Sequence, residues 1–409
     1  MRILQVNKFH YLRGGAEKYF LDMSAQLAAH GHEVAVFSMR HPKNLPSPWE
    51  KYFVSRLSFN EPKLRDKLLA PGRIIWSLEA QRKFARLVKD FRPDVIHIHN
   101  IYHQLSPSIL AVAKKHKIPV VMHLHDYKLV CPNYKLYTHG EICERCLKQR
   151  YFQAVCHNCF RDSFLMSSLV MKEMYLHHSI LKIYEKSVSC FIAPSQFMKE
   201  TVVKFGHSRD KVEVLYNFVD QDGITTSVKT KDYLLYFGRL SEEKGLPVLL
   251  EALSKTKHKY QLKLAGEGPD LISLQKKVKD LKLESQVEFL GFQSGAVLKE
   301  TIQVAKAIMM PSVWLENMPF ALLEAVAAGK VVVASRTGGL PEVITDGQTG
   351  FLFETGSSAD LTRVLDDLDN YDLGAMGQAA QKAAERFNFN DHFNKLLKIY
   401  SDLCSKKLP

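Results

Sequence analysis

Long apolar runs are missing from this sequence of 409 residues. No stretch approaches the ~18 consecutive apolar residues that a membrane-spanning helix requires, which argues against a transmembrane protein. The first residues, MRILQVN, lack the charged-then-apolar leader of a secretory signal and predict a strand instead. With 46% hydrophobic and 24% charged residues, the composition is that of an ordinary globular protein, which we expect in the cytoplasm.

Acidic residues are scarce in the N-terminal half only. Residues 1–220 carry 33 Lys and Arg against 19 Asp and Glu, whereas residues 221–409 carry 23 against 24. The net charge of +13 therefore comes entirely from the first half. A basic surface attracts nucleic acid, anionic lipid or phosphorylated ligands, and a merely solvated basic face is an equal alternative.

Cysteine is scarce outside one segment, because five of the seven cysteines fall within 29 positions. Four of them form two C-x2-C pairs, a spacing that lets each pair clamp a tetrahedral metal from a tight turn. A structural zinc ion is therefore predicted. Its expected ligands are Cys143, Cys146, Cys156 and Cys159, and Cys131, His139 and His157 could compete. Free thiols in a reducing cytoplasm, or disulfides, are the alternatives.

The N-terminal half alternates strand and helix patterns. MRILQVN, a loop with Gly14 and Gly15, a helix and the strand HEVAVFS form a β-α-β unit in which backbone amides could approach a phosphate. Two later strands end in polar residues, His97, His99 and Asn100 after one, and His123, His125 and Asp126 after the next. Strand ends face the ligand crevice in doubly wound sheets, although a structural role is favoured for any single histidine.

An insertion at about residues 127–190 interrupts this alternation and contains the cysteines. Its second part, residues 161–187, has a long helical pattern rich in Met, Leu, Phe and Tyr with three lysines. Burial against the sheet is the favoured interpretation, and a membrane surface or an acceptor groove is the alternative. A polar linker is predicted at residues 219–232.

The second half opens a new β-α-β series. Arg239 and Lys244 lie five positions apart in the loop after its first strand, where two cations could bind a diphosphate and neutralise a departing nucleotide. Glycines stand at the ends of the strands, and those expected near the ligand are Gly238, Gly266 and Gly268.

Two carboxylates eight residues apart mark the segment PSVWLENMPFALLEAVAAG. With a helix starting near Met318, Glu316 lies ahead of the first turn and Glu324 inside it, beside unpaired amides that favour an anion. Small and apolar residues surround Glu324, and a buried carboxylate needs a partner such as a pair of sugar hydroxyls. The pattern predicts a sugar-nucleotide site, whereas an isolated pair of glutamates would be solvated.

These glutamates, the following GGLPEVITDGQTGFLF and the upstream YFGRLSEEKG resemble family 4 of the retaining glycosyltransferases with the GT-B fold. The resemblance runs from the first strand to the last helix and is most specific in the C-terminal half. It implies an α/β protein with two facing Rossmann-like, doubly wound domains and a cleft between them. The expected units are an acceptor domain at 1–217, a donor domain at 218–387 and a helix at 388–409 that crosses back to the first domain.

The resemblance also implies the reaction and its residues. A sugar would pass from a UDP- or GDP-sugar to a saccharide acceptor with retention of anomeric configuration and without a catalytic metal or other cofactor. His125 would contact the transferred sugar, Arg239 and Lys244 the diphosphate, Glu316 the sugar hydroxyls and Glu324 the ribose. Gly15 would donate from its backbone. Many relatives have Gly-Phe-Gly between the glutamates, and the donor-site residues here are instead Asn317, Met318, Pro319 and Phe320.

The class of acceptor is inferred from the basic charge of the N-terminal half. A basic half with a Met-rich segment suggests a polyprenyl-diphosphate-linked saccharide at the inner face of the cytoplasmic membrane, as in assembly of capsule, O-antigen or exopolysaccharide. A sugar-nucleotide epimerase or hydrolase of the same architecture is the alternative. A zinc-containing nucleic-acid-binding protein is a remote third hypothesis, and we expect no nucleic acid partner.

Overall fold

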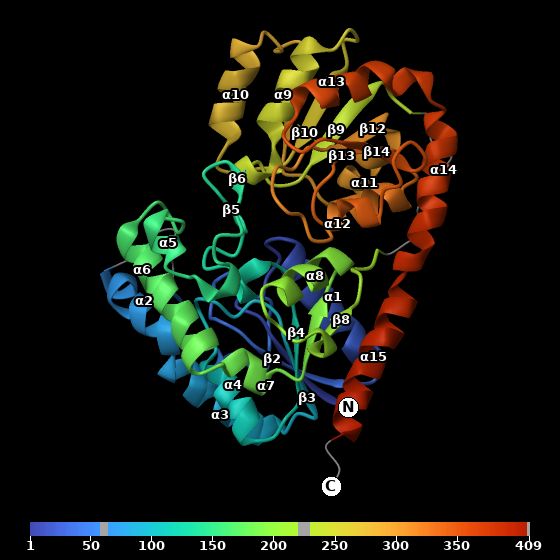
Figure 1. Cartoon of the computed structure of the whole chain (residues 1–409). Helices are drawn as coiled ribbons and strands as arrows, with labels where there is room; N and C mark the ends of the chain where they lie inside the picture. Colours follow the sequence, from blue (N-terminus) through green and yellow to red (C-terminus); the bar gives the residue numbers. More distant parts are fainter. Residues whose placement is uncertain (58–63, 220–229, 407–409) are drawn as a thin grey trace.

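The protein is described by a computed structural model over residues 1–57, 64–219 and 230–406. It has two α/β domains, drawn one above the other in Figure 1, each built on a sheet of six parallel strands. The predicted fold class of two Rossmann-like, doubly wound domains is thereby confirmed. The linker predicted at residues 219–232 lies largely outside the described residues.

The N-terminal sheet has the strand order β2-β1-β3-β4-β7-β8. Its strands are β1 (Arg2–Val6), β2 (Glu33–Phe37), β3 (Val95–Ile98), β4 (Val120–His123), β7 (Cys190–Ala193) and β8 (Val212–Val214). The chain leaves β1 towards one edge and returns at β3 on its other side, so the order reverses between these two strands. The loops after them diverge and open a crevice at the carboxyl ends.

The C-terminal sheet repeats this plan with the order β11-β10-β9-β12-β13-β14. Its strands are β9 (Tyr233–Phe237), β10 (Gln261–Ala265), β11 (Val287–Gly291), β12 (Ala307–Met310), β13 (Val332–Ser335) and β14 (Gly350–Phe353). The reversal lies between β9 and β12. The loops after these two strands carry Lys244 and Glu316, which explains why residues 72 positions apart meet.

Helices cover both faces of each sheet. Those of the first domain are α1 (Gly15–Ala29), α2 (Leu64–Trp76), α3 (Leu78–Phe91), α4 (Ser108–Lys115), α5 (Gln153–Cys156), α6 (Phe164–Met174), α7 (Ile183–Ser187) and α8 (Gln196–Lys204). The second domain contributes α9 (Leu246–Lys255), α10 (Leu271–Asp280), α11 (Gly295–Val304), α12 (Phe320–Ala327), α13 (Ser358–Asp367) and α14 (Leu373–Ala384).

The strands are buried on both faces, as their near-continuous apolar runs require. In β3, Val95 packs on the face that α1 covers, and Ile96 packs on the opposite face. In β9, Leu234 and Leu235 divide in the same way between two separate apolar clusters. Each sheet is therefore the middle layer of a three-layer domain.

The C-terminal helix α15 (Phe389–Ser405) crosses back onto the first domain, as predicted, and runs along one side of the molecule in Figure 1. Its Tyr400 hydroxyl lies 2.6 Å from His97 Nδ1, and its His392 Nε2 lies 2.8 Å from the Tyr19 hydroxyl of α1. Both contacts are buried. Helix α15 thus completes the helical layer over the N-terminal sheet.

The segment 161–187 is helical but not one helix. After α6 the chain forms a π-helical stretch, Tyr175–Ile180, and Lys182 adopts a left-handed φ of 50° before α7 begins. Glu173 of α6 is buried and binds Lys128 Nζ at 2.7 Å, so one face packs inward. Among the described helices, none has both the length and the apolar character needed to cross a bilayer.

Candidate active site

A cavity of about 940 Å³ lies between the carboxyl ends of the two sheets. Both domains line it, since it is bounded by the loop after β1, the loop after β4 and the loops after β9, β10 and β12. The predicted residues on its wall are His125, Arg239, Lys244, Glu316, Gly14, Gly15, Gly238, Gly266, Gly268, Asn317, Met318, Pro319 and Phe320. Residues predicted from separate motifs therefore share one space.

Glu316 is buried and is held by two donors. Lys244 Nζ lies 2.6 Å from its Oε1, and the Ser312 hydroxyl donates to the same oxygen at 2.6 Å. The lysine side chain keeps part of its surface open to the cavity and also lies over the ring of Trp314. A cation and a carboxylate paired at the rim of a cleft can exchange this contact for a diphosphate and a sugar hydroxyl. Ser312 was not predicted from the sequence, although a serine two residues after a buried strand was a usable signal.

The turn at Gly338 and Gly339 supports the backbone of the Glu316 loop. Gly338 has a φ of +58°, and a Cβ there would stand 1.9 Å from the Glu316 carbonyl oxygen. Gly339 N–H donates to that same oxygen at 2.7 Å. Only glycine permits so close an approach, so these glycines fix where the carboxylate stands.

Arg239 and the glycine-rich strand ends form the other side of the cavity. Gly266 has a φ of +157°, and a Cβ at this position would lie 1.8 Å from the carbonyl oxygen of Gly238. The two loops therefore pack backbone against backbone and leave room beside Arg239. The first domain closes in from the opposite side, where a Cβ on Gly15 would come within 3.2 Å of the Phe320 ring.

His125 is oriented through a chain of two buried residues. Gln5 Oε1 lies 2.9 Å from His99 Nε2, and His99 Nδ1 lies 2.9 Å from His125 Nε2. An amide oxygen only accepts, so His99 Nε2 carries its proton and His99 Nδ1 accepts from His125. Burial holds the pKa of His99 well below its usual value and that of His125 at about 3, so both rings stay neutral. His125 Nδ1 is then left as an acceptor.

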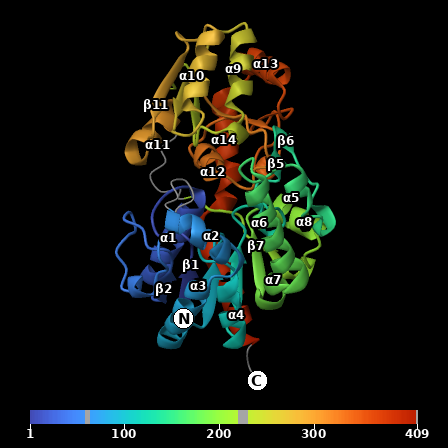
Figure 2. The ribbon, with the colours of Figure 1, turned by 90° about the vertical axis from the view of Figure 1, so that its left-hand side faces the viewer.

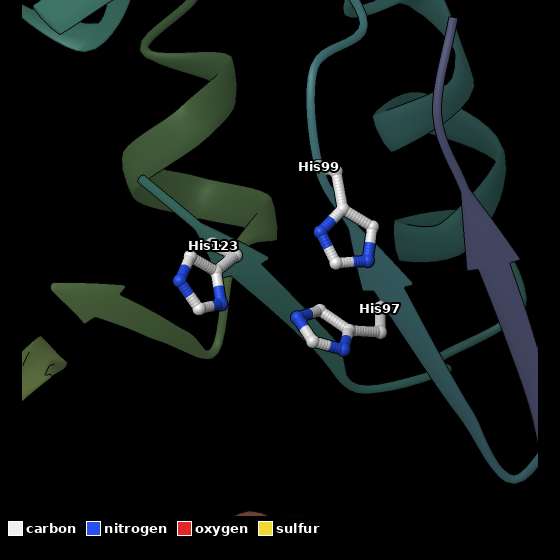
Figure 3. A group of neighbouring side chains, drawn as sticks. All are labelled: His97, His99 and His123. Carbon is white, nitrogen blue, oxygen red and sulfur yellow. The ribbon is translucent and has the colours of Figure 1, made fainter. Parts of the chain in front are cut away.

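Figure 3 shows His99 of this hydrogen-bonded chain together with its neighbours His97 and His123, on one face of β3 and β4. One nitrogen of each lies within 4.8 Å of the others. His123 stacks on His125 with ring centroids 4.4 Å apart and planes 8° apart, and neither of its nitrogens has a hydrogen-bond partner in the described chain. Within the group, His123 also stacks on His97 and on His99, with ring centroids 6.0 Å apart in each pair and planes 26° and 25° apart. Stacked rings direct their in-plane lone pairs side by side rather than at one point. We therefore interpret the group as a packing layer rather than a metal centre.

Glu324 stands apart from the other predicted residues, outside the cavity wall. It lies within α12, the helix predicted to carry it, which begins at Phe320. Burial raises the pKa of its carboxyl, and the nearby ammonium groups of Lys18 and Lys299 act in the opposite direction. The side chain is partly buried and faces cations of both domains.

The predicted zinc ligands are divided by the structure. Cys143, Cys146 and Cys159 are buried or partly buried in the insertion, and buried Cys131 accompanies them. Cys156 is exposed at the end of α5.

Two protein-family models match the chain. The model described as Glycosyltransferase Family 4 matches residues 13–222, and the model described as Glycosyl transferases group 1 matches residues 220–386. The chain belongs to glycosyltransferase family 4. The resemblance inferred from the glutamate pair and the two flanking motifs is therefore confirmed.

Relatives of this family 4 protein are found in two bacteria. It is 27% identical over 361 residues to a 42.6 kDa protein in the cps region of Klebsiella pneumoniae, which covers 84% of this chain and 87% of that one. It is 27% identical over 195 residues to WcaL of Escherichia coli, named a candidate colanic acid biosynthesis glycosyltransferase, with 45% and 48% covered.

The fold of this glycosyltransferase is also found in solved structures. HepE of Anabaena, crystallised with UDP, superimposes with a TM-score of 0.69 at 20% identity and covers 98% of this chain and 100% of that one. The lipopolysaccharide outer core galactosyltransferase WaaB has a TM-score of 0.66 at 19% identity, with complete coverage of both chains.

Proposed function

We propose that this glycosyltransferase moves a sugar from a UDP-sugar to a saccharide acceptor, with retention of anomeric configuration. The observation that carries the proposal is the single cavity in which Lys244 and Glu316 of the second domain face His125 of the first. The lysine and Arg239 would neutralise the leaving diphosphate. Glu316 and His125 Nδ1 would accept hydrogen bonds from the transferred sugar, so that electrostatic stabilisation and positioning do the catalytic work.

UDP is proposed ahead of GDP because HepE, which has the same fold, was crystallised with UDP. Ribose would lie towards Glu324, whose burial is offset when two hydroxyls donate to it. A saccharide acceptor in surface polysaccharide assembly is supported by the relatives from the cps region and by WcaL.

A polyprenyl-diphosphate-linked acceptor at the membrane is proposed from the surface of the insertion. Phe152, just before α5, and Phe164 and Leu165, at the start of α6, are exposed there, and these two helices pack on one another. Exposed apolar side chains on a domain with a basic excess suit an anionic, lipid-linked substrate.

The donor can be tested with a thermal-shift panel of UDP, GDP, ADP and CMP and their common sugar conjugates. A ligand at 100 times its Kd adds roughly 2.7 kcal/mol to the folded state, so UDP or one UDP-sugar should raise the melting temperature clearly. Glu324→Ala should lose most of this shift, whereas Glu284→Ala, at an exposed turn, should retain it. No shift with any nucleotide would remove the basis of the proposal, and nucleotide release without an acceptor product would favour a hydrolase or epimerase.

The hydrogen-bonded chain Gln5–His99–His125 predicts that His99 orients His125 for catalysis, which a residue that only packs would not do. His99→Phe keeps the ring but removes the acceptor for His125 Nε2, so kcat should fall by about tenfold, the value of one oriented hydrogen bond of ~1.4 kcal/mol. The donor KM should change little. His123→Phe is the matched control, because His123 makes no hydrogen bond to His125, and equal losses in both variants would contradict the tautomer argument.

A further inference from the structure

The cysteines of the insertion gather at the base of the β5–β6 hairpin. The two strands are β5 (Tyr137–Thr138) and β6 (Glu141–Ile142), and Cys143 follows β6 directly. Cys131 and Cys146 are both buried and belong to the same apolar cluster, whereas Cys156 is exposed. The exposed cysteine is therefore separated from the others by its environment, although its C-x2-C spacing is the same.

Asn133 links the chain segments that carry Cys131 and Cys159. The Cys131 thiol donates to Asn133 Oδ1 at 2.9 Å, and Asn133 Nδ2 donates to the Cys159 carbonyl oxygen at 3.3 Å. Cys143 N–H donates to the Leu136 carbonyl oxygen at 2.8 Å, which brings the third segment to the same loop. Asn133 Nδ2 also donates to the Tyr137 carbonyl oxygen at 2.9 Å, next to Leu136, so the segments of Cys131, Cys143 and Cys159 meet at one loop.

The same four sulfurs are neighbours of one another. The thiols of Cys131, Cys143 and Cys159 lie near enough to Cys146 to interact with it electrostatically, and those of Cys143 and Cys159 lie near enough to Cys131. A cation that binds four neighbouring cysteines compensates the charge of their thiolates.

We propose that Cys131, Cys143, Cys146 and Cys159 bind one structural zinc ion and that Cys156 is not a ligand. The set has the spacing C-x11-C-x2-C-x12-C, with the C-x2-C pair at the centre. In the described residues, no three cysteine sulfurs lie within 4.8 Å of one another. Four Zn–S bonds of ~2.3 Å require shorter distances between the sulfurs, so we expect the cysteine loops to move together when zinc binds. Each thiol releases its proton to solvent, and the resulting double negative charge lies near Arg145, whose guanidinium is 3.7 Å from Cys143 Sγ.

The zinc ion would fix the position of the β5–β6 hairpin, which contacts the donor-binding domain. The hairpin reaches the second domain in the views of Figures 1 and 2. Lys135 Nζ lies 3.1 Å from Glu243 Oε2, and the Tyr137 hydroxyl donates to Glu242 Oε1 at 3.5 Å. These glutamates belong to the turn Glu242–Lys244, which presents Lys244 to the cavity. This last link rests on the proposed function, whereas the zinc site does not.

The test is the zinc content of the full chain, purified under reducing conditions without chelator and measured by mass spectrometry. Wild type and Cys156→Ser should each hold about one zinc ion per chain. Cys131→Ser and Cys146→Ser should hold little. A zinc-free wild type after addition of equimolar zinc, or loss of zinc in Cys156→Ser with retention in Cys131→Ser, would overturn the proposal. His123→Phe should keep the ion, and its loss there would move the metal to the histidine group.

Alkylation of the wild-type protein keeps the test independent of variant folding. With zinc bound, iodoacetamide should modify Cys156 rapidly and the four ligands only after a chelator is added. Modification of Cys131 at the rate of Cys156 in the zinc-loaded protein would contradict the ligand set. Neither readout involves sugar transfer, so failure here is distinguishable from failure of the glycosyltransferase proposal.

Discussion

Replacing Lys244 with alanine is expected to lower kcat/KM by about 10²–10³-fold, because one preorganised group on a developing negative charge contributes roughly 2.7–4 kcal/mol. Lys244 Nζ already lies 2.6 Å from Glu316 Oε1, so the charge is in position before the donor arrives. Steady-state kinetics with the donor identified by thermal shift would measure the loss. Lys277→Ala is the matched control, since Lys277 forms a similar pair with Glu251 on the surface of the same domain.

A fall in melting temperature would accompany the loss of Lys244 for a separate reason. Glu316 would stay buried with the Ser312 hydroxyl but without its cation, and removing one partner of a buried pair is costly. Lys244→Arg separates the two effects, because it keeps the charge and changes its geometry. If Lys244→Ala folded normally and retained wild-type kcat/KM, the lysine would not act on the leaving group.

Local sequence patterns were sufficient for the fold and for most of the cavity wall. Glu316, Lys244 and the strand-end glycines were predicted from separate motifs and meet at the carboxyl ends of two sheets, since parallel β-α-β units bring those ends together. Glu324 was predicted with them and lies outside the cavity wall. The helix of residues 388–409 was expected to return to the first domain from the family resemblance, and Tyr400 and His392 now show the contacts that hold it there.

Contacts between distant segments were beyond the reach of such patterns. Gln5 looked like a single polar residue in an apolar strand, and its partner His99 lies 94 positions away. The C-x2-C spacing predicted Cys156 as a ligand, but it could not indicate that Cys156 is exposed and Cys131 buried, because exposure is decided by how the insertion packs. Lys182 has a left-handed backbone conformation, which interrupts the helical segment before α7. No glycine or proline stands there, so the sequence did not predict this break.

The glutamate of the GGLPE motif, Glu342, contacts the first domain, which its sequence did not indicate. Glu342 accepts from the backbone N–H groups of Gln196 and Phe197 at 2.8 and 2.7 Å, at the start of α8 in the other domain. A carboxylate is favourable at a helix N-terminus, so this residue joins the domains beside the cavity. Asn317 adds a second bridge, since its Nδ2 donates to the His125 carbonyl oxygen at 3.1 Å.

The four stacked histidines of β3 and β4 are expected to remove about 5 kcal/mol of unfolding free energy on acidification from pH 7.5 to 5.5, a contribution comparable to the whole stability of a domain. Burial lowers the pKa values of their four rings to about 3 or well below the usual value; they are His97, His99, His123 and His125. The unfolded chain binds these protons from about pH 6.5 downward and the folded chain does not, so stability is present above pH 6.5 and is lost as pH falls. Each ring contributes about 1.4 kcal/mol at pH 5.5.

His123→Phe isolates this effect, because both His123 nitrogens are buried without a partner and a phenyl ring can take its place between Tyr19 and His125. Urea titrations at the two pH values should show a loss about 1.4 kcal/mol smaller than in wild type. His116→Phe, at an exposed site, should leave the loss unchanged. Identical pH dependence in wild type and His123→Phe would mean that the stack takes up protons while folded, and the neutral tautomers assigned to His99 and His125 would then have to be abandoned with it.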